Sequence, residues 1–193
     1  MSAVDLVGQV VRLREFRATD VDDSVAVVGD DRVTRFLSFD SRSRDEARTM
    51  ITGTIERARQ EPRAEYYLAV TTRDDDHLIG FARLGLTGTR AAKLGYAIAA
   101  DHWGRGYATD AARTMITFGF TTLDLHRISA AIGPDNPASI AVVKRLGFTH
   151  EGRLRHHVFT NGAWRDSELF SLLTHEWAQG PSGESGRTGT PAE

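Results

Sequence analysis

The 193-residue sequence contains no cysteine. This absence excludes disulfide bonds, thiolate nucleophiles and cysteine-ligated metal sites together. The composition is compatible with a reducing compartment but does not prove one. Any catalysis by this chain has to use other side chains or backbone groups.

Long apolar runs and an excess of charge of one sign are also missing. No stretch approaches the roughly 18 apolar residues of a membrane-spanning helix, and the first residues show no secretion signal. The formal net charge is −2, so no overall basic field favours nucleic acid or an anionic membrane as a partner. We therefore expect a soluble, cytoplasmic protein with no nucleic-acid or membrane partner.

The proportions of hydrophobic and charged residues are typical of a globular domain. Hydrophobic residues make up 40% and charged residues 26% of the chain, which are ordinary values, and the length allows a sizeable core. Residues 180–193 show no apolar pattern and contain many Gly, Ser, Thr and Pro residues. The sequence predicts a single domain over residues 1–179 and a disordered tail over residues 180–193.

Apolar spacing and capping signals predict four helices. A short one follows Thr19 or Asp20 and ends at Gly29. The next follows a capping box between Ser43 and Glu46, and the others cover residues 107–120 and 137–146, the last with Asn136 as its cap.

Seven segments have the patterns of strands. Two pairs should form hairpins, one around the polar turn 73–76 and one around the Asn161-Gly162 turn. The acidic triplet 74–76 is expected to be a solvated turn, and no metal site is predicted. The predicted strands cover residues 10–16, 65–72, 77–86, 91–100, 126–132, 148–160 and 164–173.

The stretch 94–123 reads as a strand, a glycine turn and a helix. Gly104 and Gly106 precede helical apolar spacing, and the unpaired N–H groups of a first helical turn attract anions. A phosphate-bearing cofactor is the first hypothesis, and glycines that simply turn the chain are the alternative.

Two other phosphate motifs fit less well. No Gly-Lys-Ser/Thr follows the turn, as a nucleotide P-loop requires. A dinucleotide fingerprint would need a small residue at Thr109 and an acidic residue after the next strand, whereas Asp124 precedes that strand. A dinucleotide-dependent oxidoreductase is therefore nearly excluded.

Several motifs occur in a specific order and spacing within residues 94–173. They are residues 95–98, 103–111, 136–139, 144–148 and 151–152, and Asn161-Gly162-x-x-x-Asp166. Taken together, these motifs resemble the acetyl-CoA-binding half of the GNAT acyltransferase superfamily, and they are most similar to the RimJ/RimL-type branch that acetylates protein N-termini. The pyrophosphate loop of this superfamily usually reads Gln/Arg-x-x-Gly-x-Gly/Ala, with Trp103 at the first place here and Asp110 where Glu is common.

The resemblance implies a cofactor, acetyl-CoA, and the residues that bind it. The pantetheine arm would hydrogen-bond exposed strand backbone near Ile98 as an added strand would, and the pyrophosphate would meet the N–H groups of the glycine turn. Arg105 would add charge there or remain a solvated loop residue. The predicted cofactor-binding residues are Ala97, Ile98, Gly104, Arg105, Gly106, Tyr107, Ala108, Thr109, Asn136 and Ser139.

The resemblance also suggests the groups that move protons. Ser139 would protonate the departing thiolate, unless it is a first-turn residue that bonds locally, and Asn136 would contact cofactor or substrate besides capping its helix. Some members of the branch carry a glutamate where this chain has Val158. His156 faces the same side of a regular strand as Val158, so it is the candidate proton relay, with a surface position as the alternative.

Glu15 and Asp166 are the remaining candidates for a base. The missing glutamate weakens the case for a protein N-terminus as the acceptor. Two alternatives stay open. One has a small-molecule amine, such as a polyamine or an antibiotic, as the acceptor, and the other has an acyl-CoA larger than acetyl-CoA as the donor. A catalytically silent module that binds acyl-CoA is the alternative from another class of function, binding without catalysis.

We expect an α/β GNAT fold with a mixed, mostly antiparallel sheet of about seven strands, a splay in the middle of the sheet, and helices on both faces. The expected function is acetyl-CoA-dependent N-acetylation of a primary amine. Transfer would be direct, because no cysteine can hold an acyl intermediate. The oligomeric state stays open, with a homodimer among the options.

Overall fold

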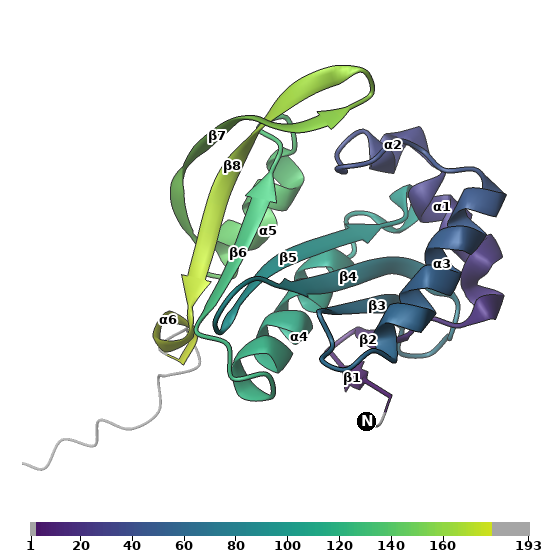
Figure 1. Cartoon of the computed structure of the whole chain (residues 1–193), viewed down its shortest axis with the longest axis horizontal. Coiled ribbons are helices and arrows are strands. Elements are labelled where there is room, and N and C mark those ends of the chain that lie inside the picture. The colour runs from purple at the N-terminus through teal and green to yellow at the C-terminus, as the bar shows by residue number, and fades with distance from the viewer. Residues whose placement is uncertain (1–2, 179–193) are drawn as a thin grey trace, which may run out of the picture.

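The computed structural model describes residues 3–178, in which eight strands form one mixed sheet (Figure 1). The strand order is β1-β2-β3-β4-β5-β6-β8-β7, and every neighbouring pair is antiparallel except β5 and β6. The predicted mixed, mostly antiparallel sheet is confirmed. The strands are β1 (Asp5–Val7), β2 (Val11–Glu15), β3 (Glu65–Thr72), β4 (Leu78–Leu86), β5 (Ala91–Ile98), β6 (Arg127–Ile132), β7 (Thr149–Thr160) and β8 (Ala163–Leu173).

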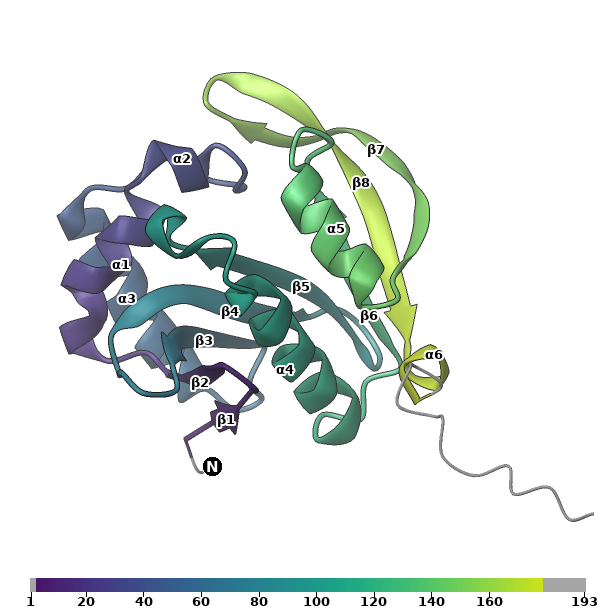
Figure 2. The ribbon, with the colours of Figure 1, turned by 180° about the vertical axis from the view of Figure 1, so that it is seen from behind.

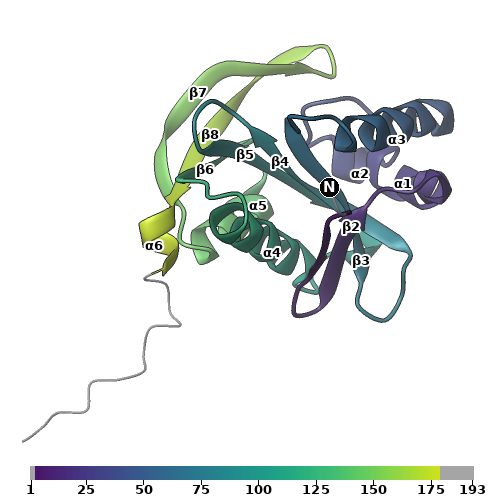
Figure 3. The ribbon, with the colours of Figure 1, turned by 60° about the horizontal axis from the view of Figure 1, so that its bottom comes forward.

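Helices cover both faces of this sheet, as predicted (Figure 3). One face carries α1 (Val21–Val28) and α3 (Arg44–Ala58), whose apolar side chains pack with Tyr67 and Phe81 of the sheet. The other face carries α4 (Tyr107–Thr121) and α5 (Pro137–Arg145), which bury side chains such as Met115 and Val143 against the sheet. The remaining helices are η1 (Ala18–Asp20), α2 (Asp31–Thr34), η2 (Ala100–His102) and α6 (Thr174–Ala178).

The long helices begin at the residues that the sequence predicts. The Ser43 side chain accepts a hydrogen bond from the Glu46 N–H, and the Glu46 side chain accepts from the Ser43 N–H, so the capping box is present. Asn136 caps α5 by accepting from the Ser139 N–H, with Pro137 in the first turn. These caps fix where both helices enter the fold.

Besides the single-turn helices η1 and η2, three short elements were not predicted from the sequence patterns. They are β1, which pairs with β2 and adds an eighth strand, and the helices α2 and α6. Each has three to five residues, which is too short for an apolar period to show. The predicted tail, residues 180–193, lies outside the described residues. Within residues 3–178, no helix is long and apolar enough to cross a membrane.

The predicted splay lies between β5 and β6. Residues 91–93 of β5 pair with residues 127–129 of β6, and beyond these pairs the two backbones separate. Both strands continue past the last pair, to Ile98 and to Ile132. The antiparallel pairs β4–β5 and β6–β8 run along the full lengths of β5 and β6, so each strand remains fixed to its own half of the sheet.

A buried carboxylate joins the mouth of α4 to the N-terminal hairpin. Asp110 is 5% exposed, and its Oδ2 accepts hydrogen bonds from the Val10 N–H at 2.7 Å and the Val11 N–H at 3.1 Å. Its position in the first helical turn also suits a negative charge. Asp110 therefore fixes the start of α4 against the turn between β1 and β2.

We predict that Asp110→Ala lowers the free energy of unfolding by about 1.5–3 kcal/mol, because the buried Val11 N–H and the partly buried Val10 N–H both lose a charged acceptor. Urea denaturation measures this change. Asp45→Ala is the matched control, since Asp45 also lies in the first turn of a 15-residue helix but is exposed and pairs with Arg48. That control should change stability by less than about 0.5 kcal/mol. Equal losses in the two variants would contradict the structural role of Asp110.

Candidate active site

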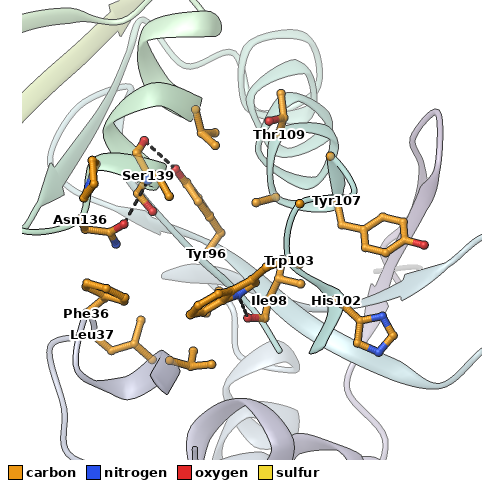
Figure 4. A pocket seen from close by; sticks show the side chains of 18 of the residues that line it. Phe36, Leu37, Tyr96, Ile98, His102, Trp103, Tyr107, Thr109, Asn136 and Ser139 are labelled. Carbon is orange, nitrogen blue, oxygen red and sulfur yellow. Dashed lines mark hydrogen bonds between the residues drawn. The ribbon is translucent and has the colours of Figure 1, made fainter. Parts of the chain in front are cut away.

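A cavity of about 640 Å³ lies where β5 and β6 separate. Its walls come from the end of α2 and the loop after it, the end of β5, the mouth of α4, and the start of α5 (Figure 4). All the predicted cofactor residues except Arg105 line this cavity. They are Ala97, Ile98, Gly104, Gly106, Tyr107, Ala108, Thr109, Asn136 and Ser139.

The mouth of α4 is built to receive an anion. Gly106 is the N-cap with φ of 79°, and Gly104 has φ of 77°, a backbone region that favours glycine. The Asp110 N–H makes the first intrahelical bond, to the Gly106 carbonyl, so the N–H groups of the preceding turn have no helical partner. Nothing lies within 4 Å of where a Cβ would stand on either glycine. A phosphate group can therefore approach these N–H groups closely.

The free edge of β5 forms the floor of the cavity. The Ala99 N–H donates to the Ile79 carbonyl across β4, so the peptide groups of Ile98 face the opposite edge, toward the splay. The Trp103 indole Nε1–H donates to the Ile98 carbonyl at 2.7 Å, which confirms this direction (Figure 4). The edge can accept an extended chain with amide groups, in the manner of an added strand.

Asn136 and Ser139 stand together on the wall formed by α5. The Asn136 Oδ1 accepts from the Ser139 N–H at 3.1 Å, and the Ser139 carbonyl accepts from the Tyr96 hydroxyl at 3.3 Å (Figure 4). None of the described residues bonds the Ser139 hydroxyl, which leaves it available inside the cavity. Burial raises the pKa of Tyr96 to about 12, so its phenol remains a neutral donor.

His156 does not line the cavity. The expectation that it faces the same side as Val158 assumed a regular strand, whereas the β7–β8 register shifts between Leu154 and Val158 and His156 has φ of 48°. Its ring stacks on Trp164, with centroids 6.2 Å apart. The face assigned to His156 from simple alternation is therefore wrong, because a bulge interrupts the period of two.

Three carboxylates considered from the sequence are engaged elsewhere. Glu15 binds the guanidinium of Arg63. Asp166 accepts from the His156 backbone N–H at 2.9 Å, and Asp124 pairs with Arg90. None of the three lines the cavity. Within residues 3–178, no group of three or more His, Cys, Asp and Glu side chains is placed to hold a metal ion.

Two parts of the wall are absent from the predicted binding residues, although one of them lies in the motif at residues 144–148. Phe36 and Leu37 follow the four-residue helix α2, and no motif marks them. Arg145 lies in the last turn of α5, and its Nη1 is 3.4 Å from the Thr109 Oγ1 at the mouth of α4. A cation there adds to the attraction of the helix mouth for phosphate, whereas Arg105 is exposed and outside the cavity.

Comparison with known proteins gives the family. Residues 11–149 match the model of the acetyltransferase (GNAT) domain. An uncharacterized N-acetyltransferase, p20, of Bacillus licheniformis is 31% identical over 169 residues, 86% of this chain and 94% of that protein. The RimJ protein of Mycobacterium smegmatis, solved with CoA-disulfide, superposes with a TM-score of 0.76 at 24% identity, over 92% of this chain and 93% of that one.

Relatives with named acceptors match shorter parts of the chain. The [ribosomal protein uS5]-alanine N-acetyltransferase of Escherichia coli K12 is 32% identical over 118 residues, 60% of this chain and 61% of that protein. The spermidine N(1)-acetyltransferase of the same strain is also 32% identical, over 88 residues, 46% of this chain and 47% of that one. The match over residues 11–149 and the 31% identity across most of the chain show that the protein belongs to the GNAT family of N-acetyltransferases.

Proposed function

We propose that this protein transfers an acetyl group from acetyl-CoA directly to a primary amine, with a protein N-terminus as the acceptor. One observation carries the proposal: a single cavity joins an anion-binding helix mouth, a free strand edge and the unbonded hydroxyl of Ser139. The three features suit the phosphates, the amides and the thioester of acetyl-CoA in turn. A cytoplasmic location and a homodimer remain predictions.

Bound acetyl-CoA would supply the acyl group as an activated thioester. The free N–H groups of residues 107–109 and the cation of Arg145 would hold its pyrophosphate at the mouth of α4. The N–H of Ile98 faces the splay and would donate to the thioester carbonyl or to a neighbouring amide of the arm. These backbone groups are fixed by the sheet and the helix, so they cost little reorganisation on binding.

Ser139 would deliver the proton that transfer requires. When the amine nitrogen bonds to the acyl carbon, the carbon–sulfur bond breaks and the sulfur needs a proton. The Asn136 cap holds the Ser139 backbone, and the Tyr96 hydroxyl bonds the Ser139 carbonyl, so the side-chain hydroxyl is the free polar group of this residue. The proton leaving the amine would pass to water, since the base candidates Glu15, Asp166 and His156 lie outside the cavity.

An N-terminal amine suits a cavity that contains none of the base candidates Glu15, Asp166 and His156. Its pKa of about 8 leaves a sizeable neutral fraction near pH 7.5, unlike lysine at about 10.4. The acceptor side of the cavity is apolar at Phe36 and Leu37, and its one lining carboxylate, Asp135, is paired with Arg165. A polyamine, the named acceptor of one relative, would find few free negative charges there.

An assay of CoA thiol release with a panel of acceptors tests the proposal. The panel holds short peptides with free N-termini, the same peptides with blocked N-termini, spermidine and an aminoglycoside. Release with the free peptides alone is expected. Release with spermidine or the aminoglycoside would favour a small-molecule acceptor. If a longer acyl-CoA in place of acetyl-CoA gave faster release, the donor would be different. CoA binding without release would favour a silent binding module.

We predict that Gly106→Val raises the dissociation constant for CoA at least about tenfold, because the side chain enters the space that a phosphate would use. Isothermal calorimetry measures this constant. Gly88→Val is the matched control, since Gly88 also has positive φ, 64°, and open space around its Cβ, but lies outside the cavity. Both variants should lose similar stability from backbone strain. Equal CoA affinities in the two variants would count against a phosphate at Gly106.

We predict that Ser139→Ala lowers kcat about a hundredfold and changes the dissociation constant of CoA less than about twofold, because a proton donor acts during transfer. Steady-state kinetics and calorimetry give the two values. Ser129→Ala, which removes a β6 hydroxyl outside the cavity, should change neither. An unchanged kcat in Ser139→Ala would remove Ser139 from the mechanism.

A further inference from the structure

The acceptor end of the cavity is bounded by two walls that no backbone pairing holds together. One wall is the loop after α2, with Phe36 and Leu37, and the other is the start of α5, with Asn136. The sheet beneath them is splayed, because β5 and β6 do not pair beyond Lys93 and Ser129. Side chains that cross the splay must therefore set the distance between the walls.

Arg165 makes such a crossing. It lies on β8, and its Nη2 is 3.3 and 3.2 Å from the two carboxylate oxygens of Asp135, directly before Asn136. Its Nη1 donates to the carbonyl of Arg35, directly before Phe36, at 2.5 Å. The side chain is 23% exposed. One guanidinium thus contacts a lining residue of each wall, and its planar fork fixes the directions of both contacts.

A second contact holds the same loop to the same hairpin. The Asp40 Oδ1 accepts from the Thr160 hydroxyl at 2.6 Å and from the Asn161 N–H at 2.7 Å, and these bonds lower the pKa of Asp40. Figures 1 and 2 both show the tip of the β7–β8 hairpin reaching toward α2. The hairpin is therefore attached to the loop at its tip by Asp40 and nearer the cavity by Arg165.

We propose that Arg165 is a positioning residue for the amine acceptor, which it serves by fixing the separation of the Phe36 and Asn136 walls. The inference rests on the proposed function, because it assigns the acceptor to this end of the cavity. Arg165 does not line the cavity and does not contact the helix mouth or the β5 edge. Its removal should therefore affect the acceptor far more than CoA.

The kinetic test compares three variants. Arg165→Ala should raise the acceptor KM about tenfold, with a smaller change in kcat and a CoA dissociation constant within about twofold of wild type. Arg165→Lys should give an intermediate KM, because an ammonium keeps the charge but cannot donate as a fork to both partners. Arg153→Ala is the matched control, since Arg153 lies on the same hairpin and bonds Glu168 of the neighbouring strand. It should leave all three values unchanged.

A distance measurement reports the wall separation without any acceptor. The chain has no cysteine, so spin labels on Ser38→Cys in the loop after α2 and Pro134→Cys just before α5 are unambiguous. Both positions are exposed. Adding Arg165→Ala should broaden the distribution of distances between the labels, and adding Arg153→Ala should not.

The results distinguish a failure of the role proposed for Arg165 from a failure of the proposed acetyltransferase function. An active Arg165→Ala variant with unchanged acceptor KM overturns the inference alone, whatever the label distances. A wild-type chain that releases no CoA with any acceptor overturns the proposed function and the role of Arg165 with it. Where Arg165→Ala does not fold, Arg165→Lys decides by the same measurements, and an unchanged KM in that variant contradicts the inference.

Discussion

The pairing of β5 with β6 stops after Lys93 and Ser129, and the site depends on this early stop. Past it, the Ile98 peptide groups face no strand, and buried backbone groups without partners are costly. Trp103 bonds the Ile98 carbonyl and so satisfies one of them. The others can bond water or an extended chain in the splay.

Helices pack on both faces of the splayed sheet. Side chains on α1 and α3 pack on one face of β3 and β4, and those on α4 and α5 pack on the other face of the sheet. Each half of the sheet is also fixed by full antiparallel pairing, β4 with β5 and β8 with β6. The strands cannot close on each other without breaking these contacts. The two halves are therefore joined at the cavity by side chains such as Tyr96, which reaches the Ser139 carbonyl, and Arg165.

The cavity residues proposed to bind the cofactor could be located from the sequence because the turn and the cap that mark them are local. Gly104 and Gly106 mark a turn that needs positive φ, and Asn136 marks a cap within three residues of its partner. The acceptor side depends on contacts between distant segments. The bond from Arg165 to the Arg35 carbonyl spans 130 residues, and no local pattern indicates it. The bulge at His156 likewise depends on its pairing with β8, so alternation alone put that side chain on the wrong face.

We propose that CoA lies in the splay, with its amides on the β5 edge and its phosphates at the mouth of α4. Amide hydrogen exchange, followed residue by residue by NMR with and without CoA, tests this claim without any substitution. We expect CoA to slow exchange at the Ile98 N–H and at residues 107–109, and to leave exchange at the Ala99 N–H, already bonded to the Ile79 carbonyl, unchanged. Saturating CoA that leaves exchange at Ile98 and at the helix mouth unaltered would contradict it.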